Sequence, residues 1–485
     1  MRPAPGAEVA GRLALLLSEG GTMGRPITSS SPGARSRRRC GARLVLVRSA
    51  ALLLTLLFAA GAEAAKPGTL LYAKHIGAGL KSGAFASAIA AGPKGVTALA
   101  GWQVKSGTVY PMVAKYTSAG KRVWLKRHTK AGTGRAADVA FDRSGNVYVA
   151  ATVKYGTSDD IVVLKYSASG ALRWTTKPYD GGEKGADEAE KLAVDAKGNV
   201  VVLGQSERAG LTGIVVLKYT KTGKAAWPEP TRWDPYQDGF SVVDLALDGK
   251  GDVYVAGSMS YDGFTTAVIW KTRGSDGAKS GGWHYEPLHG DSSSFRVLTV
   301  RGSSVVATGA VWTESVDKSR NALVVKLDRD LREKARREWG VGNKDEEFWE
   351  AVVDGKGNVF VTGGQWVMKY AKAVTMKLDA KLKTVWSKTY MPASRYALGQ
   401  YIARDGAGNI YVGGYEDFSP VQPAKSLLTI KYSAAGARKW VRAWSGSKWS
   451  NPSGLVLGSR GGVYVAGDVW NKQGIYQAVL LKYRR

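Results

Sequence analysis

The sequence has almost no cysteine, since Cys40 is the single one among 485 residues. Cys40 lies in an N-terminal segment that we expect to be removed. The mature chain would then have no disulfide, no thiolate nucleophile and no cysteine metal ligand. Histidine is also scarce, with four copies, and there is no GxSxG elbow, HExxH helix, P-loop or Rossmann fingerprint. We therefore expect no cofactor, no bound metal and no catalytic residue.

The chain has one long hydrophobic run, near its N-terminus. A basic stretch from Arg35 to Arg48 precedes the apolar segment Ser49–Ala62, and small residues flank Glu63. This order is typical of a secretory signal peptide, whereas a membrane-spanning helix needs about 20 apolar residues. We expect residues 1–64 to be a signal peptide with an upstream extension, Met23 being the alternative start. The predicted location is secreted or extracytoplasmic, with no transmembrane helix after cleavage; an uncleaved anchor is the alternative.

Acidic residues are few relative to basic ones, 40 against 69, which gives a net charge of +29. Without residues 1–64, which carry nine Arg and three Glu, the chain keeps 60 basic and 37 acidic residues, a net charge of +23. Such a charge favours anionic partners, although solubility alone also accounts for it. No RNP or helix-turn-helix pattern accompanies the charge, so we expect no nucleic acid partner.

Glycine, by contrast, is abundant, with 61 copies, many of them in a recurring word such as GNVYVAG or GNVVVLG. A small residue ends each copy, at Gly101, Ala151, Gly204, Gly257, Gly309, Gly363, Gly414 and Gly467. The copies are 50 to 54 residues apart. A period of this size with several short strands per copy is typical of a β-propeller, in which each repeat is a four-stranded blade. We predict an all-β fold, a single eight-bladed propeller of antiparallel blades over residues 65–485.

The third copy shows how strands A to D of a blade are expected to follow one another. We place them at residues 191–194, 200–204, 214–219 and 224–227. The last copy ends after its strand C, at 478–483, whereas residues 68–74 have strand D character with no strands before them. The N-terminal strand is therefore predicted to complete the last blade and close the ring. Tyr72 then stands where the other blades place Trp.

Two features of the repeat resemble known families. The pattern GNVYVAG…VVLKY…G…W covers nearly all of residues 68–485 and resembles the repeats of secreted bacterial β-propellers, often labelled SBBP-like. A turn glycine four residues before Trp, as in Gly223 and Trp227, is similar to the tryptophan-docking motif of eight-bladed quinoprotein-like propellers. The resemblance implies blade-to-blade packing in an exported protein. Quinone chemistry is not implied, because those enzymes carry a vicinal cysteine pair that the mature chain lacks.

Two kinds of side chain recur from blade to blade, and we interpret both as structural. A Trp of strand D is expected to pack against the next blade, at Trp124, Trp174, Trp227, Trp283, Trp339, Trp386 and Trp440. A Lys near the end of strand C occurs in all eight blades, at Lys115, Lys165, Lys218, Lys271, Lys326, Lys377, Lys431 and Lys482. Its expected partner is the Asp of the A–B turn; a ring of lysines that binds a polyanion is the alternative.

Aromatic residues outside the repeat are the candidate ligand contacts. In a propeller the B–C and D–A connections share one face, and loops on a rigid scaffold carry function. We predict B–C loops with Trp102, Tyr155, Tyr261, Trp312, Trp366, Tyr415 and Trp470. The D–A loops are predicted to hold Trp233, Tyr236, Tyr396, Trp444 and Trp449. Such rings beside charged residues suit stacking against sugars or peptides; capping of the central channel is the alternative.

We predict a non-enzymatic propeller that acts as a binding or scaffolding module of the bacterial cell envelope. Its partner is expected to be a carbohydrate, an anionic cell-wall polymer or an envelope protein. The alternative is an enzyme of the polysaccharide lyase or glycosidase type at the mouth of the central channel. A lyase needs a Tyr or His base near an Arg or Lys, and a glycosidase needs two carboxyl groups about 5–10 Å apart. A channel mouth with only Trp, Ser and Gly would exclude both.

Overall fold

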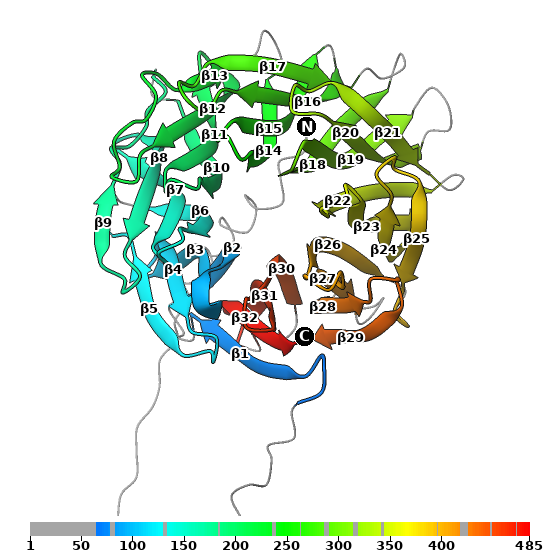
Figure 1. Cartoon of the computed structure of the whole chain (residues 1–485). Coiled ribbons are helices and arrows are strands. Elements are labelled where there is room, and N and C mark those ends of the chain that lie inside the picture. Colours follow the sequence, from blue (N-terminus) through cyan, green and yellow to red (C-terminus); the bar gives the residue numbers. More distant parts are fainter. Residues whose placement is uncertain are drawn as a thin grey trace, which may run out of the picture. The chain divides into compact units, whose positions relative to one another are not determined.

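The computed structural model describes residues 65–77, 83–129, 133–182, 185–234, 239–261, 263–285, 291–313, 319–340, 344–394, 396–417, 425–446, 449–471 and 473–485. The signal peptide predicted for residues 1–64 lies outside them. The unit from Ala65 to Arg485 contains eight four-stranded sheets. The sheets are antiparallel and stand in a ring around a common axis (Figure 1). The predicted eight-bladed β-propeller is confirmed.

Each blade contributes one strand to each of four positions, from the axis outward, and we number the blades by their innermost strands. The A strands are β2 (Ala84–Ala91), β6 (Gly134–Phe141), β10 (Asp187–Val194), β14 (Phe240–Leu247), β18 (Ser292–Arg301), β22 (Asp345–Val353), β26 (Ala397–Arg404) and β30 (Trp449–Leu457). The B strands are β3 (Thr97–Lys105), β7 (Val147–Tyr155), β11 (Val200–Arg208), β15 (Val253–Tyr261), β19 (Ser304–Thr313), β23 (Val359–Val367), β27 (Ile410–Asp417) and β31 (Gly462–Trp470).

The outer half of each blade is formed by strands C and D. The C strands are β4 (Thr108–Tyr116), β8 (Ser158–Tyr166), β12 (Leu211–Tyr219), β16 (Phe264–Thr272), β20 (Ser319–Leu327), β24 (Tyr370–Leu378), β28 (Lys425–Tyr432) and β32 (Tyr476–Arg484). The outermost D strands are β5 (Arg122–Arg127), β9 (Leu172–Thr175), β13 (Thr231–Trp233), β17 (Lys279–His284), β21 (Glu333–Trp339), β25 (Thr384–Tyr390), β29 (Arg438–Trp444) and β1 (Leu70–Ile76). One short 3₁₀ turn, η1 (Pro93–Gly95), joins β2 to β3.

The two ends of the propeller chain close the ring. Strand β1 pairs antiparallel with β32, so the last sheet has the order β1-β32-β31-β30. Tyr72 stands opposite Lys482 in this pairing. Backbone hydrogen bonds extend it, from Gly68 N to Arg484 O at 2.8 Å and from Arg484 N to Thr69 O at 3.0 Å. The N-terminal strand therefore completes the last blade, as predicted, and covers an edge that would otherwise be open.

A β-bulge at the same position of every innermost strand explains the small residue that ends each repeat word. In the first blade the register of β2 slips opposite Gly101. A Cβ on Gly101 would collide with the carbonyl oxygen of Phe85, and one on Gly363 with that of Glu347. The second blade tolerates Ala151 at this position. Close approach of the bulged backbone therefore selects a small residue here.

The recurring Lys and Trp side chains tie each blade to the next. The ammonium of Lys218 and the indole N–H of Trp227 both donate to the carbonyl oxygen of Gly274, in the next blade's C–D turn, at 2.6 and 3.1 Å. The first blade makes the same pair of bonds to Ala168 O. The expected partner Asp195 lies 4.0 Å from Lys218 Nζ and mainly accepts backbone N–H groups of its own turn. In these two blades the shared carbonyl is therefore the principal partner of the lysine, whereas Lys271 pairs with Asp252 at 3.4 Å.

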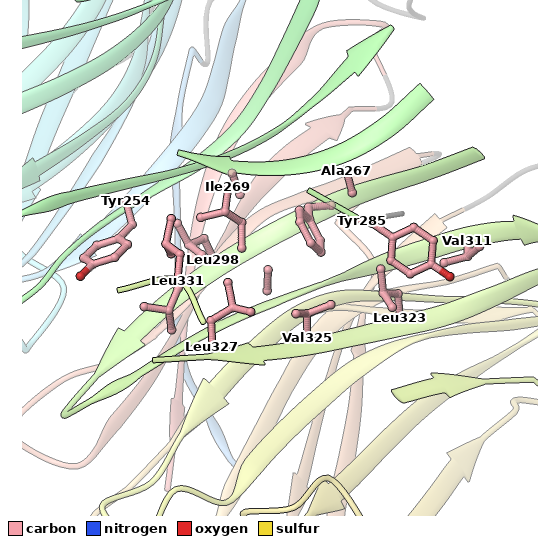
Figure 2. Close-up of a cluster of buried hydrophobic side chains, with 14 residues drawn as sticks. Tyr254, Ala267, Ile269, Tyr285, Leu298, Val311, Leu323, Val325, Leu327 and Leu331 are labelled. Carbon is pink, nitrogen blue, oxygen red and sulfur yellow. The ribbon is translucent and has the colours of Figure 1, made fainter. Parts of the chain in front are cut away.

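Hydrophobic packing lies mainly between blades. Figure 2 shows the cluster between the fourth and fifth blades, where Tyr254 and Ile269 meet Leu298, Leu323 and Leu327. The other large clusters likewise combine two neighbouring blades. Strands B and C are covered on both faces, which explains their almost continuous apolar runs.

The segment 205–213, expected to be a B–C loop, is instead a tight hairpin. Strands β11 and β12 extend through it and leave only Ala209 and Gly210 between them. Both residues have positive φ angles, 51° and 77°. This is the turn geometry that matches the twist of the flanking strands. The polar side chains of the segment misled the sequence interpretation, because strands exposed beyond the core need no apolar residues.

Strand D of the third blade lies at β13 rather than at residues 224–227 as predicted. Pro228 and Pro230 follow Trp227 and have no N–H to donate to a ladder. Ala225 makes an isolated bridge to Tyr219, and the continuous ladder with β12 begins only at Thr231. Trp227 keeps its docking contact although it lies outside the strand.

Candidate functional site

The predicted ligand-contact aromatics belong mostly to strands, not to loops. Five B–C connections are only two residues long. The B strands carry Trp102, Tyr155, Tyr261, Trp312, Trp366, Tyr415 and Trp470. Trp233 lies in β13 and Trp444 in β29, while Tyr396 immediately precedes β26. Tyr236 and the side chain of Tyr261 lie outside the described residues. Rigid strand ends therefore hold these rings.

One group of rings forms a series over the first and eighth blades. Trp102 stacks on Phe85, with ring centroids 4.9 Å and planes 14° apart. Phe85 contacts Tyr476 at 4.7 Å. Tyr476 in turn stacks on Trp470 at 5.7 Å and meets Trp449 edge-on at 6.4 Å. Strand register produces these contacts, because Trp102 stands opposite Phe85 and Trp470 opposite both Trp449 and Tyr476, and opposite side chains share one face of a sheet.

A second group continues the series over the sixth and seventh blades. Tyr415 stacks on Tyr396 with centroids 6.1 Å apart, and Trp366 Nε1 donates to the Tyr396 hydroxyl at 3.3 Å. Lys425 joins the two groups, since its ammonium lies 4.3 Å from the ring centroid of Tyr415 and 5.6 Å from that of Trp449. We call the eight rings the aromatic arc: Trp102, Phe85, Tyr476, Trp470, Trp449, Tyr415, Tyr396 and Trp366.

The arc is accessible, and two cations lie over its rings. Trp470 is 40% exposed, and the other rings except the buried Tyr415 are half-buried. Besides Lys425, the guanidinium of Arg135 lies 5.1 Å from the ring centroid of Trp102. Rings held in place by stacking offer an apolar face at little cost in conformational entropy. This arrangement suits a ligand with flat apolar faces and anionic groups.

The remaining predicted contacts lie apart from the arc. Tyr155, on the second blade, is 60% exposed. Trp312 is half-buried beneath the guanidinium of Arg320, which lies 4.6 Å from its ring centroid. Trp444 is half-buried on an outermost strand. Trp233 is 8% exposed and packs in the core between the third and fourth blades, so its ring is not offered at the surface.

The sequence interpretation missed Phe85 and Tyr476 and placed Trp449 in a D–A loop, whereas it begins strand β30. Phe85 and Trp449 stand at the start of strand A, and Tyr476 at the start of strand C. Each pairs with an aromatic residue near the end of strand B. These pairs could have been found from the strand register. Predicting the register requires the true length of each hairpin and the position of the bulge.

Buried carboxyl groups lie beside the arc. Asp468, two residues before Trp470, accepts a hydrogen bond from Ala86 N of the next blade at 2.5 Å, and burial raises its pKa to about 8. Glu416 accepts a hydrogen bond from the Tyr390 hydroxyl at 2.7 Å, and burial raises its pKa also. Asp468 therefore keeps a proton at neutral pH while it joins the eighth blade to the first.

A second feature is a group of ionisable side chains on the innermost strands, which we call the axial cluster. It contains Asp138, Lys191, Asp244, Glu350 and Tyr401, each the residue that follows the bulge of its strand. They come from the second, third, fourth, sixth and seventh blades. The same backbone irregularity therefore sets five ionisable side chains, three acids, a lysine and a tyrosine, at one level of the ring.

The carboxyl groups of the axial cluster brace neighbouring blades. Asp138 accepts a hydrogen bond from Leu192 N of the next blade at 2.9 Å. Asp244 makes the corresponding contact with the fifth blade. Glu350 accepts a hydrogen bond from Ile402 N at 2.6 Å. In each of these three blades the acid therefore has a structural role, because it links its blade to the next one.

Lys191 is the counter-ion that these acids share. Burial raises the pKa of Glu350 to about 8 and that of Asp244 to about 6, although the charge of Lys191 opposes both shifts. Burial also acts against the charge of Lys191, but Asp138 and Asp244 outweigh it and hold the lysine pKa above its ordinary value. A carboxylic acid that is protonated at neutral pH thus shares one cluster with an ammonium and with Asp244, whose pKa of about 6 leaves it mostly ionised.

Metal chemistry finds no support in the part of the chain that the structure describes. No group of three or more His, Cys, Asp or Glu side chains is placed there to hold a metal ion. In the axial cluster the ammonium of Lys191 already supplies the positive charge among the acids.

No helix in the described ranges has the length and apolar content needed to cross a membrane.

Comparison with known proteins supports the fold. No family model and no curated protein matches the sequence. Among solved structures, a europium-containing methanol dehydrogenase matches with a TM-score of 0.50 at 10% identity, over 86% of this chain and 93% of that chain. Sqt1 from Chaetomium thermophilum matches with a TM-score of 0.50 at 10% identity, over 84% and 97%.

Identities this low show a shared fold and carry no activity across. The match to a methanol dehydrogenase agrees with the predicted quinoprotein-like propeller architecture, whereas membership of the SBBP-like family stays a prediction. What the geometry and the comparisons establish together is that this chain is an eight-bladed β-propeller.

Proposed function

We propose that this propeller is an exported binding module of the cell envelope that holds a carbohydrate on its aromatic arc. The observation that carries the proposal is the continuity of the arc, eight rings from four adjacent blades joined by stacking and by Lys425. Aromatic side chains supply large apolar contact area with few rotatable bonds. A series of them on rigid strand ends matches the repeated flat faces of a polysaccharide.

Charge favours an acidic polymer over a neutral one. Residues 65–485 have a net charge of +23, and Arg135 and Lys425 lie over rings of the arc. A field of this sign raises the local concentration of anionic ligands. Export rests on the signal peptide predicted from residues 1–64. An envelope protein in place of a polysaccharide is the other partner that such a surface would accept.

The experiment is a binding array of glycans and cell-wall polymers, probed with residues 65–485 at low and high salt. We expect binding to an acidic polysaccharide such as polygalacturonate. Trp470→Ala and Tyr476→Ala should each weaken it at least tenfold, about 1.4 kcal/mol or more, because each removes a stacking ring. Tyr155→Ala is the matched control, since Tyr155 is exposed but lies outside the arc. No binding at either salt, or an equal loss in the control, would contradict the proposal.

The axial cluster favours a second candidate function, an acid–base enzyme of the polysaccharide lyase or glycosidase type. Tyr401 and Lys191 supply the hydroxyl and cation that a lyase needs. Glu350, protonated at neutral pH, and Asp244, with a pKa of about 6, supply the acid and base of a glycosidase. The test is the release of reducing ends or unsaturated uronates from polygalacturonate. Activity that Glu350→Gln abolishes supports the enzyme, and intact polymer after prolonged incubation excludes it for this substrate.

A further inference from the structure

We propose that the first blade carries a separate pocket for an oxyanion, the carboxylate or sulfate of an acidic saccharide. The pocket has a volume of about 370 Å³. It is lined by three cations, Lys105, Lys126 and Arg127, and by hydroxyl side chains that include Thr108 and Tyr110. No carboxylate lines it. Ammonium, guanidinium and hydroxyl donors are the groups that bind oxyanions.

The β3–β4 hairpin builds one wall of the pocket. Ser106 and Gly107 form its turn, with φ angles of 50° and 80°. Lys105 stands opposite Thr108 as the closing pair of the hairpin. Two residues further in, Gln103 stands opposite Tyr110 on the same face, because side chains alternate along a strand. The tight turn therefore fixes an ammonium and two hydroxyls on one side of the blade.

Strand β5 supplies the other two cations, and one of them is preorganised. Arg127 donates from Nε to the side-chain oxygen of Gln103, a residue only 5% exposed. A guanidinium carries five N–H donors, so this bond orients the fork and leaves donors for a ligand. Lys126 precedes Arg127 and lines the same pocket. The lining therefore contains a held guanidinium and two lysines.

The charge of this pocket is not compensated within its blade. Residues 64–137 contain twelve Lys and Arg and no Asp or Glu. In the described structure no ion pair joins Lys105, Lys126 or Arg127 to a carboxylate. A second pocket, between the fifth and sixth blades, is less suited to an anion. Asp354 lines it, and its Lys326 already donates to two backbone carbonyl oxygens.

The first blade carries both the pocket and one end of the aromatic arc. Trp102, the terminal ring, immediately precedes Gln103 in β3 and points to the opposite face of the strand. A saccharide stacked on the arc would pass over the β3–β4 hairpin to place an anionic substituent in the pocket. The saccharide part of this inference rests on the proposed function, whereas capture of an oxyanion does not.

The test compares two double variants with the same change of charge. Lys105→Gln/Lys126→Gln removes two cations from the pocket. Lys94→Gln/Lys121→Gln removes two from turns at the opposite end of the same blade and is the control. The probes are an oligogalacturonate, its neutral methyl ester and inorganic sulfate, titrated into residues 65–485, with circular dichroism to verify folding.

We expect the unmodified protein to bind the oligogalacturonate at least tenfold more tightly than its methyl ester, since one charge-assisted hydrogen bond accounts for a factor of this size. Sulfate should compete with the oligogalacturonate. The pocket variant should lose both the preference and the competition, and the control should keep them. An equal loss in the control would show a general field effect and overturn the pocket. Absence of any preference in the unmodified protein would overturn it as well.

Trp470→Ala separates this inference from the proposed function. If both hold, this variant weakens both oligosaccharides and leaves sulfate binding intact. If sulfate binding depends on Lys105 and Lys126 while Trp470→Ala changes nothing, the pocket stands and the arc fails. If Trp470→Ala weakens both saccharides but sulfate does not bind, the arc stands and the pocket fails.

Discussion

The phenol ring of Tyr72 lies against the backbone of Gly120, where a Cβ on the glycine would come within 2.7 Å of the ring. Trp124 meets Gly170 at the same distance, and Trp227 meets Gly277 at 2.8 Å. The contact that closes the ring is thus the one that docks each blade on the next, with a phenol in place of an indole. Ring closure therefore uses the same contact as the other blade interfaces, because strand β1 supplies the docking residue of the last blade.

Gly120→Ala should destabilise the propeller more than Gly107→Ala. The two glycines have nearly equal φ angles, +81° and +80°, so each substitution incurs about 1–2 kcal/mol for alanine in the left-handed region. Only Gly120 faces a ring, and forcing that contact apart adds about 1–3 kcal/mol. Denaturant unfolding of both variants measures the difference. Equal losses would show that the Tyr72 contact does not stabilise closure.

Trp227→Ala should lower the free energy of unfolding by about 3–5 kcal/mol, the usual range for deletion of a buried Trp. The indole is 5% exposed and donates to Gly274 O. Trp470→Ala is the comparison, because its ring is 40% exposed and its loss should cost much less. A melting temperature for Trp227→Ala within a degree or so of the unmodified protein would contradict the docking role.

The free energy of unfolding of Glu350→Gln should increase relative to that of the unmodified protein as the pH rises. The pKa of Glu350 is raised to about 8 in the folded chain, so the folded state binds the proton more tightly than the unfolded state. Its contribution to stability is present below the unfolded pKa and is lost as the pH rises through the folded pKa. Glutamine keeps an acceptor for Ile402 N and cannot ionise.

The measurement for Glu350 is the unfolding free energy of both proteins from about pH 5 to about pH 9. The difference between variant and unmodified protein should grow in favour of the variant across this range. A difference that is constant with pH would mean that Glu350 titrates normally. Asp468→Asn should show the same sign, since burial raises the pKa of Asp468 to about 8 as well.

The salt dependence of binding should distinguish the contribution of the rings of the arc from that of its cations. Trp470→Ala should lower the affinity for an acidic oligosaccharide by a similar factor at low and high salt, because stacking is not screened. Lys425→Gln should lower it chiefly at low salt, since exposed charges are largely screened near molar ionic strength. Titrations at both salts with Tyr155→Ala as reference decide this. An effect of Trp470→Ala that vanishes at high salt would point to charge alone.

The blade architecture was predictable because the sequence patterns that specify a blade are local and recur in each repeat. The spacing of the small residues at Gly101 and its counterparts gave the number of blades, and the unpaired strand around Tyr72 gave the closure. Trp227 was recognisable as a docking residue by its distance from the turn glycine. These signals each reside within one repeat, where strand periodicity and turn chemistry act over a few residues.

The candidate site was only partly predictable. Six of the eight rings of the arc were expected, but as loop residues, because polar strand extensions look like loops. Phe85 and Tyr476 gave no sign of their role, since it depends on which residue they oppose. The clustering of Asp138, Lys191 and Glu350 was not expected at all, because a bulge that the sequence does not announce sets their common level.

The sequence by itself thus determined the repeat, the eight blades and the closure of the ring, since each blade is one packing unit with its own periodic pattern. Only the tertiary structure decided what lies side by side around the axis. Asp468 bonds Ala86 across 382 residues, and the arc and the axial cluster depend on contacts of the same kind. Such neighbours come from ring closure, hairpin length and bulge position acting together, and no single repeat contains all three.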